Sequence, residues 1–168
     1  EVRTFRSLYV KGAPAAEIER VLREVFEEVL APFFAAARFE RLPLLEHYGF
    51  QARFAASVRR NVTAIAGDDG PTRFADLVGF YERFLPGLVA PPEHRYVSMV
   101  HGDLNGANIL IDARDNVWVI DWFHAAPSHA LKDLIKLEND VLFLYTPIAD
   151  EAELAEATRL SDLLRAVE

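Results

Sequence analysis

The most informative stretch of the sequence is HGDLNGAN, residues 101–108, followed at residues 120–122 by IDW. Both stretches border short runs of aliphatic and β-branched residues, a composition that favours strands. The stretch DARDN, residues 112–116, has the composition of a tight turn. The sequence therefore predicts a β-hairpin with polar loop residues at its ends, built from short strands at 96–100, 109–111 and 117–120.

Helical patterns lie on both sides of this β element. Apolar residues recur at helical spacing over 15–30, 44–62, 74–85, 131–145 and 150–164. Pro32 is expected to end the first helix, and Asp150 with Glu153 resembles a capping box for the last. With 168 residues the chain has the length of a single domain over 1–168. The predicted fold class is α+β and predominantly helical.

Composition narrows the function classes. The formal net charge of −8 and the pI near 5.1 argue against a nucleic-acid partner. No apolar run approaches the roughly 20 residues of a spanning helix, so no membrane partner is expected. The chain has no Cys and no secretory signal, so we expect a cytoplasmic protein. Because Glu1 is not Met, we also expect a piece of a longer protein.

Three polar side chains at the predicted strand ends fit the chemistry of phosphoryl transfer. A carboxylate such as Asp103 can orient an attacking hydroxyl and accept its proton. Asn108 and Asp121 offer an amide and a carboxylate oxygen. Oxygen ligands of this kind are those that Mg²⁺ prefers on nucleotide phosphates. The hypothesis is therefore a phosphotransferase site.

The motif His-Gly-Asp-Leu-x-x-x-Asn-Ile-Leu, followed by Ile-Asp-Trp, resembles the catalytic core of the aminoglycoside phosphotransferase and choline kinase-like families, which are relatives of the protein kinases. The resemblance implies Asp103 as catalytic base, and Asn108 and Asp121 as metal and cofactor-binding residues. It implies Mg²⁺ and ATP, or another nucleoside triphosphate, as cofactors. His101 would order the catalytic loop, and Asp133 would brace it.

The resemblance covers only the C-terminal lobe of such kinases, with the small hairpin carrying the catalytic and metal-binding loops. Neither a glycine-rich hairpin nor a strand Lys precedes His101. The expected partners are an N-terminal nucleotide lobe of the same parent chain and a small-molecule hydroxyl substrate of the aminoglycoside or choline type. Asp140 or Glu138 would contact a cationic acceptor, and the isolated chain is expected to be inactive.

Other interpretations of these residues stay open at this point. The chain can be a non-catalytic, kinase-like module for nucleotide binding or signalling. Asp103 and Asn108 can be plain turn residues, with Asp121 ending a strand. His124 and His129 can join Asp121 in a transition-metal site.

Overall fold

The computed structural model describes residues 1–88 and 93–165. The chain divides into two compact units, one formed by Glu1–Arg38 with Tyr96–Glu168 and the other by Phe39–Arg95. The single domain expected over 1–168 stays a prediction.

The first unit begins with a short strand and a helical layer. Strand β1 (Arg3–Thr4) leads into α1 (Phe5–Val10), and then α2 (Ala15–Arg23) continues into the π-helical turn η1 (Glu24–Val29). Together α2 and η1 confirm the helix predicted over 15–30. Pro32 lies in the first turn of α3 (Ala31–Ala35), where its missing N–H costs no hydrogen bond.

Two small antiparallel sheets contain the strands of this unit. In the first, with the order β1-β4-β5, β4 (Ile109–Ile111) pairs with β5 (Val117–Val119). The predicted hairpin is therefore present. In the second sheet, β3 (His94–Val100) pairs with β6 (Ala126–His129), with Val97 opposite His129.

The prediction that strands occur only at 96–120 was wrong. Strands β1, β6 and β2 (Arg38–Arg41) lie outside that range. They are two to four residues long, and β6 contains Pro127. Such segments carry almost no local pattern and become strands through pairing with a neighbour.

The core of the first unit connects its helices to the hairpin. Its buried side chains, at most 8% exposed, come from α1, α2, η1, the loop before β4, the hairpin and α8 (Lys132–Asn139). They are Phe5, Leu8, Val21, Val25, Leu30, Leu104, Ile109, Ile111, Val117 and Leu137. Leu104 is fully buried between the polar residues of the 101–108 loop, so the core itself anchors that loop.

The chain of the first unit ends in helices. After the 3₁₀ turn η4 (Trp122–His124) and β6 come α8, the π-helical turn η5 (Asp140–Tyr145) and α9 (Glu151–Arg165). Asp150 accepts a hydrogen bond from the N–H of Glu153 at 2.9 Å, which confirms the predicted cap. Among residues 1–88 and 93–165, none of the helices has the length and apolar character that crossing a bilayer requires.

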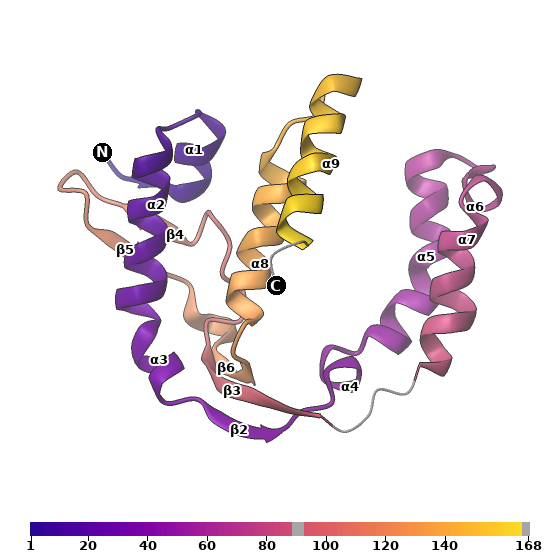
Figure 1. Ribbon diagram of the computed structural model, residues 1–168, viewed down its shortest axis with the longest axis horizontal. Coiled ribbons are helices and arrows are strands. Elements are labelled where there is room, and N and C mark those ends of the chain that lie inside the picture. The colour runs from indigo at the N-terminus through magenta and orange to yellow at the C-terminus, as the bar shows by residue number, and fades with distance from the viewer. Residues whose placement is uncertain (89–92, 166–168) are drawn as a thin grey trace. The chain divides into compact units, whose positions relative to one another are not determined.

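The second unit is a small helical hairpin that begins within β2. It contains α4 (Leu44–Tyr48), α5 (Phe50–Ala66), α6 (Gly70–Arg73), α7 (Ala75–Gly79), η2 (Phe80–Phe84) and η3 (Leu85–Gly87). Helix α5 lies beside α7 and η2 (Figure 1). The core of the second unit consists of Val58, Val62 and Val78. Arg59 of α5 pairs with Glu82 of η2 through two hydrogen bonds of 3.0 and 2.7 Å.

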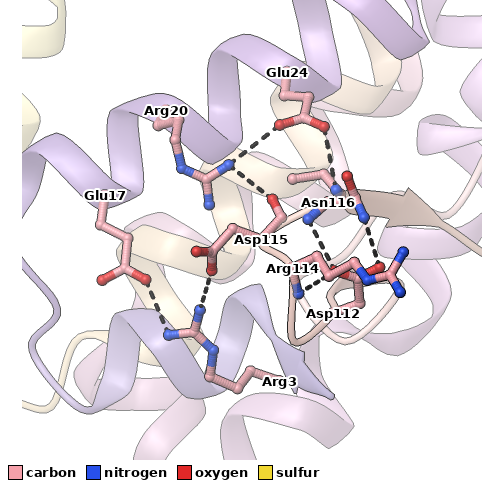
Figure 2. A network of polar contacts seen from close by, with 9 residues as sticks. Arg3, Glu17, Arg20, Glu24, Asp112, Arg114, Asp115 and Asn116 are labelled. Atoms are coloured by element: carbon pink, nitrogen blue, oxygen red, sulfur yellow. Dashed lines mark hydrogen bonds and ion pairs between the residues drawn. The ribbon is translucent and has the colours of Figure 1, made fainter. Parts of the chain in front are cut away.

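A polar network ties the hairpin of the first unit to α2 (Figure 2). The Arg3 guanidinium donates to Glu17 at 3.0 Å and to Asp115 at 2.9 Å. Arg20 donates to the Asp115 carbonyl at 3.1 Å, while Glu24 accepts the N–H of Val117 at 3.2 Å. The hairpin that precedes the Ile-Asp-Trp segment is thereby fixed at its turn and along β5.

Asp112 organises the turn itself and gives it a pH dependence. Its carboxylate accepts hydrogen bonds from the side chain of Asn116 at 2.9 Å and from the N–H of Arg114 at 2.8 Å. These bonds, the Asn116 bond first, hold the pKa of Asp112 well below its usual value. The ionised carboxylate therefore stabilises the folded hairpin above the unfolded pKa of about 3.9, and this contribution is lost as the pH falls below it.

Asp112→Asn is therefore expected to lower the thermal midpoint at pH 7 and to matter progressively less below about pH 4. Thermal unfolding of both proteins between pH 7 and pH 3 measures this difference. Asp76→Asn, at an exposed position of α7, is the matched control. A difference between wild type and Asp112→Asn that stays constant from pH 7 to pH 3 would contradict the role given to the carboxylate.

Candidate functional site

The loop 101–108 and the end of the hairpin are joined by hydrogen bonds. The N–H of Ile120 donates to the carbonyl of Asn108 at 3.0 Å. The buried ring of His101 contacts the Ile120 carbonyl through Nε2 at 2.7 Å, and its Nδ1 accepts the N–H of Asp103 at 3.3 Å. Because Nδ1 is an acceptor, the proton lies on Nε2, which donates to Ile120. His101 thus links the start of the loop to the segment that carries Asp121.

Asp133 fixes the start of the loop from α8. Its carboxylate is 1% exposed and accepts the N–H of His101 at 2.7 Å and the N–H of Gly102 at 2.9 Å. Gly102 has φ +87°, and a Cβ there would lie 2.2 Å from the carbonyl oxygen of His124. Glycine is therefore required at this position. The two hydrogen bonds to Asp133 and the close approach of Gly102 to the His124 carbonyl therefore fix the backbone that leads into Asp103.

Asp103 presents a partly solvated carboxylate. Its side chain is 42% exposed, and Lys136 Nζ lies 3.9 Å from its Oδ1. On the other side, Asn105 Nδ2 is 3.4 Å from its Oδ2. The carboxylate is therefore bracketed by one cation and one amide and still faces solvent. Such a group can accept a proton from a bound hydroxyl.

Asn108 is nearly buried, and its amide has a defined orientation. Its Nδ2 donates to the Asp103 carbonyl at 3.0 Å. The amide nitrogen is therefore directed at the loop, and Oδ1 is the atom that can bind a hard cation. Asp103 and Asn108 are directly linked by this bond.

Asp121 lies two residues after the end of β5 and is exposed. Its backbone lies in the left-handed region, with φ 64° and ψ 52°. A residue with a Cβ adopts this conformation at a cost of order 1 kcal/mol, and such strain concentrates at functional sites. Asp121 follows Ile120, the residue paired with Asn108. The structure thus brings the two segments together, although it records no direct contact between the side chain of Asp121 and those of Asp103 or Asn108.

Within the described ranges 1–88 and 93–165, no group of three or more His, Cys, Asp or Glu side chains could hold a metal ion. The alternative of a transition-metal site built from Asp121, His124 and His129 therefore finds no support there. A magnesium site with one carboxylate and one amide oxygen needs no such cluster, because Mg²⁺ takes its remaining ligands from phosphates and water.

The sequence did not predict the contacts that the loop makes through Gly106. The N–H of Gly106 donates to the Tyr145 hydroxyl at 3.0 Å, and its carbonyl accepts the N–H of Arg6 at 2.8 Å. Asp140 is 3% exposed and accepts from Lys136 at 2.8 Å. The expectation that Asp140 contacts a cationic acceptor is therefore wrong, because its charge is already paired inside the protein. Glu138, the other candidate, is exposed.

Comparisons with known proteins agree with a kinase-like fold. The family model described as "Ternary complex associated domain 9" matches residues 69–168. Solved structures of glucosamine kinase match 94% of this chain, with 18% identity and a TM-score of 0.54 for crystal form A, and 17% and 0.58 for crystal form B. A glucosamine kinase in complex with glucosamine, ADP and inorganic phosphate matches with 17% identity and a TM-score of 0.53.

No curated protein matches the sequence. The chain spans only 45 to 46% of the length of the glucosamine kinase chains. At these identities the likeness concerns the fold: this chain has the fold of part of a kinase.

Proposed function

The chain belongs to the ternary complex associated domain 9 family, and from this premise, together with its kinase-like fold, we propose that it is the catalytic-lobe part of an ATP-dependent phosphotransferase. The reaction transfers the γ-phosphate of a nucleoside triphosphate to a hydroxyl group of a small molecule. The observation that supports this most strongly is the 101–108 loop, in which Asp103 and Asn108 are hydrogen-bonded to each other beside the end of β5.

In this proposal Asp103 is the catalytic base. Its carboxylate is half-solvated, so an acceptor hydroxyl can reach it, while its backbone is held by the buried His101 and Asp133. A base on a fixed loop loses little entropy when the acceptor binds, which favours proton transfer. The role of His101 and Asp133 is to position the loop.

Asn108 and Asp121 are proposed to hold Mg²⁺. The oriented amide of Asn108 offers Oδ1, and Asp121 offers an exposed carboxylate after β5. When bound, Mg²⁺ neutralises charge on the transferred phosphoryl group. Two protein oxygens fit this ion because it retains water and phosphate ligands.

The acceptor is proposed to be a small polyol or amino sugar. Glucosamine, which one of the structurally similar kinases holds together with ADP and inorganic phosphate, falls in this class. The aminoglycoside and choline classes remain proposals of the same kind. Because Asp140 is buried and paired with Lys136, we propose that the exposed Glu138 of α8 contacts a cationic acceptor.

We propose that nucleotide binding needs a second lobe in addition to the residues of this chain. The kinase chains matched by the fold are about twice as long as the part that it covers. We therefore propose that the parent protein contains an N-terminal nucleotide lobe and that the isolated chain has little turnover.

A phosphotransfer assay on the full-length product of the gene tests this function. Mg-ATP is supplied with glucosamine, an aminoglycoside and choline as acceptors. We expect ADP release that depends on Mg²⁺ and on one of these hydroxyl acceptors. Nucleotide binding without transfer to any acceptor would favour the non-catalytic module instead.

A further inference from the structure

A second set of contacts runs from the loop to α8 and η5 and back. It leaves the loop at Gly106, whose N–H donates to the Tyr145 hydroxyl at 3.0 Å. Tyr145 in turn donates to Asp140 at 3.3 Å, and Asp140 accepts from Lys136 at 2.8 Å. The circuit returns to the loop at Asp103, 3.9 Å from the Lys136 ammonium. Both ends therefore lie in the segment between the proposed base and the proposed metal ligand.

The two central residues of this set of contacts are buried. Tyr145 is 6% exposed and Asp140 is 3% exposed. A buried carboxylate is costly unless it is paired, and Lys136 supplies the pairing charge. Burial raises the pKa of the Tyr145 hydroxyl, so this group remains protonated and able to donate to Asp140. The half-exposed ammonium of Lys136 extends from this buried pair to the solvated carboxylate of Asp103.

The π-helical turn η5 explains how Asp140 and Tyr145 meet. Residues five apart fall on different faces of an α-helix, which has about 3.6 residues per turn. A π-helical turn closes hydrogen bonds between residues five apart and so aligns them. The hydroxyl of Thr146 also caps the Val141 carbonyl, five residues earlier, at 2.8 Å. Such turns occur frequently at functional sites.

The loop itself is shaped to accept Tyr145. A Cβ on Gly106 would lie 2.8 Å from the Tyr145 ring and 3.1 Å from the Arg6 nitrogen. The Gly106 carbonyl is held by that same Arg6 N–H at 2.8 Å. The backbone N–H and C=O of Gly106 are thus both hydrogen-bonded to residues outside the loop. Any side chain at position 106 would push Tyr145 away from the loop.

We propose that Tyr145, Asp140 and Lys136 are positioning residues that fix the Asp103–Asn108 segment, next to the His101–Gly102 segment that Asp133 holds. Lys136 gives Asp103 a fixed charge partner, and Tyr145 fixes the peptide at Gly106. This inference rests on the proposed function for its effect on turnover, but the positioning of the loop is measurable without any reaction.

Amide hydrogen exchange of this chain tests the positioning directly. Tyr145→Phe removes only the hydroxyl that accepts the Gly106 N–H, and Tyr9→Phe, at a tyrosine whose ring lies 6.4 Å from that of Tyr145, is the matched control. We expect exchange at Gly106 to become about tenfold faster in Tyr145→Phe and to stay unchanged in Tyr9→Phe. Equal exchange at Gly106 in the two variants overturns the proposal.

Turnover of the full-length gene product tests whether Lys136 positions Asp103. Lys136→Met is expected to lower kcat about 10- to 100-fold with little change in the KM for ATP, because misorientation of the base affects the chemical step. Lys136→Arg, which keeps the charge that pairs with Asp140 and faces Asp103, is expected to restore most of kcat. If Asp103→Asn abolishes turnover while Lys136→Met keeps the wild-type kcat, the positioning role of Lys136 is wrong and the proposed function stands. If Asp103→Asn keeps full turnover, the proposed function fails.

Discussion

Asp133→Ala is expected to lower the free energy of unfolding by about 3 kcal/mol. The substitution leaves the buried N–H of His101 and the partly buried N–H of Gly102 without their acceptor, and a buried group without a partner costs about 1–3 kcal/mol. Urea unfolding followed by tryptophan fluorescence measures the loss; Trp122, one of the two tryptophans, packs against His101 at 4.9 Å between ring centroids. We expect the 101–108 loop to unfold together with the tertiary structure of the first unit.

Glu138→Ala is the matched control for this substitution, since Glu138 is an exposed acid in the same helix. It is expected to change stability by less than about 0.5 kcal/mol. Asp133→Asn should fall between the two, because it keeps one carbonyl acceptor but turns an amide donor toward a backbone N–H. Equal stability of Asp133→Ala and Glu138→Ala would show that the carboxylate does not hold the loop.

Asp103→Asn is expected to lower kcat of the full-length gene product by about 10²- to 10⁴-fold, the range for loss of a general base. The amide is similar in size but does not accept the hydroxyl proton. The thermal midpoint should stay near the wild-type value, because the Asp103 side chain is 42% exposed and its Oδ1 is 3.9 Å from its ion-pair partner. Steady-state kinetics with saturating acceptor measures the change.

Asp76→Asn in α7 provides the control for an exposed carboxylate outside the 101–108 loop. Full turnover in Asp103→Asn would remove Asp103 as the base. A parallel loss in both variants would indicate a general effect of charge instead of a role in the reaction.

The sequence predicted those parts of the fold that have their own local pattern. The apolar spacing over 15–30 and the turn composition of 112–116 each identify an element from one stretch of chain. The polar residues Asp103, Asn108 and Asp121 were also predictable as a set, because they border strand-like runs.

The remaining features depend on partners far apart in the sequence. Strand β6 forms against β3, and its Pro127 argues against a strand when taken alone. Tyr145 and Asp140 contact each other because the segment that contains them is a π-helical turn. The α-helix predicted over 131–145 would place the two side chains on different faces. Asp140 was expected to contact a cationic acceptor, yet Lys136 pairs with it inside the protein and allows its burial.

We propose that Asn108 and Asp121 hold a divalent cation at the phosphates of a nucleotide next to Asp103. Addition of Mn²⁺ with ADP to the ¹⁵N-labelled protein, monitored by paramagnetic broadening of amide signals, tests it most directly. The account predicts that the amides of Asn108, Asp121 and Asp103 broaden first, and that Asp121→Asn strongly weakens this effect. Broadening that begins elsewhere and is insensitive to Asp121→Asn would contradict the account.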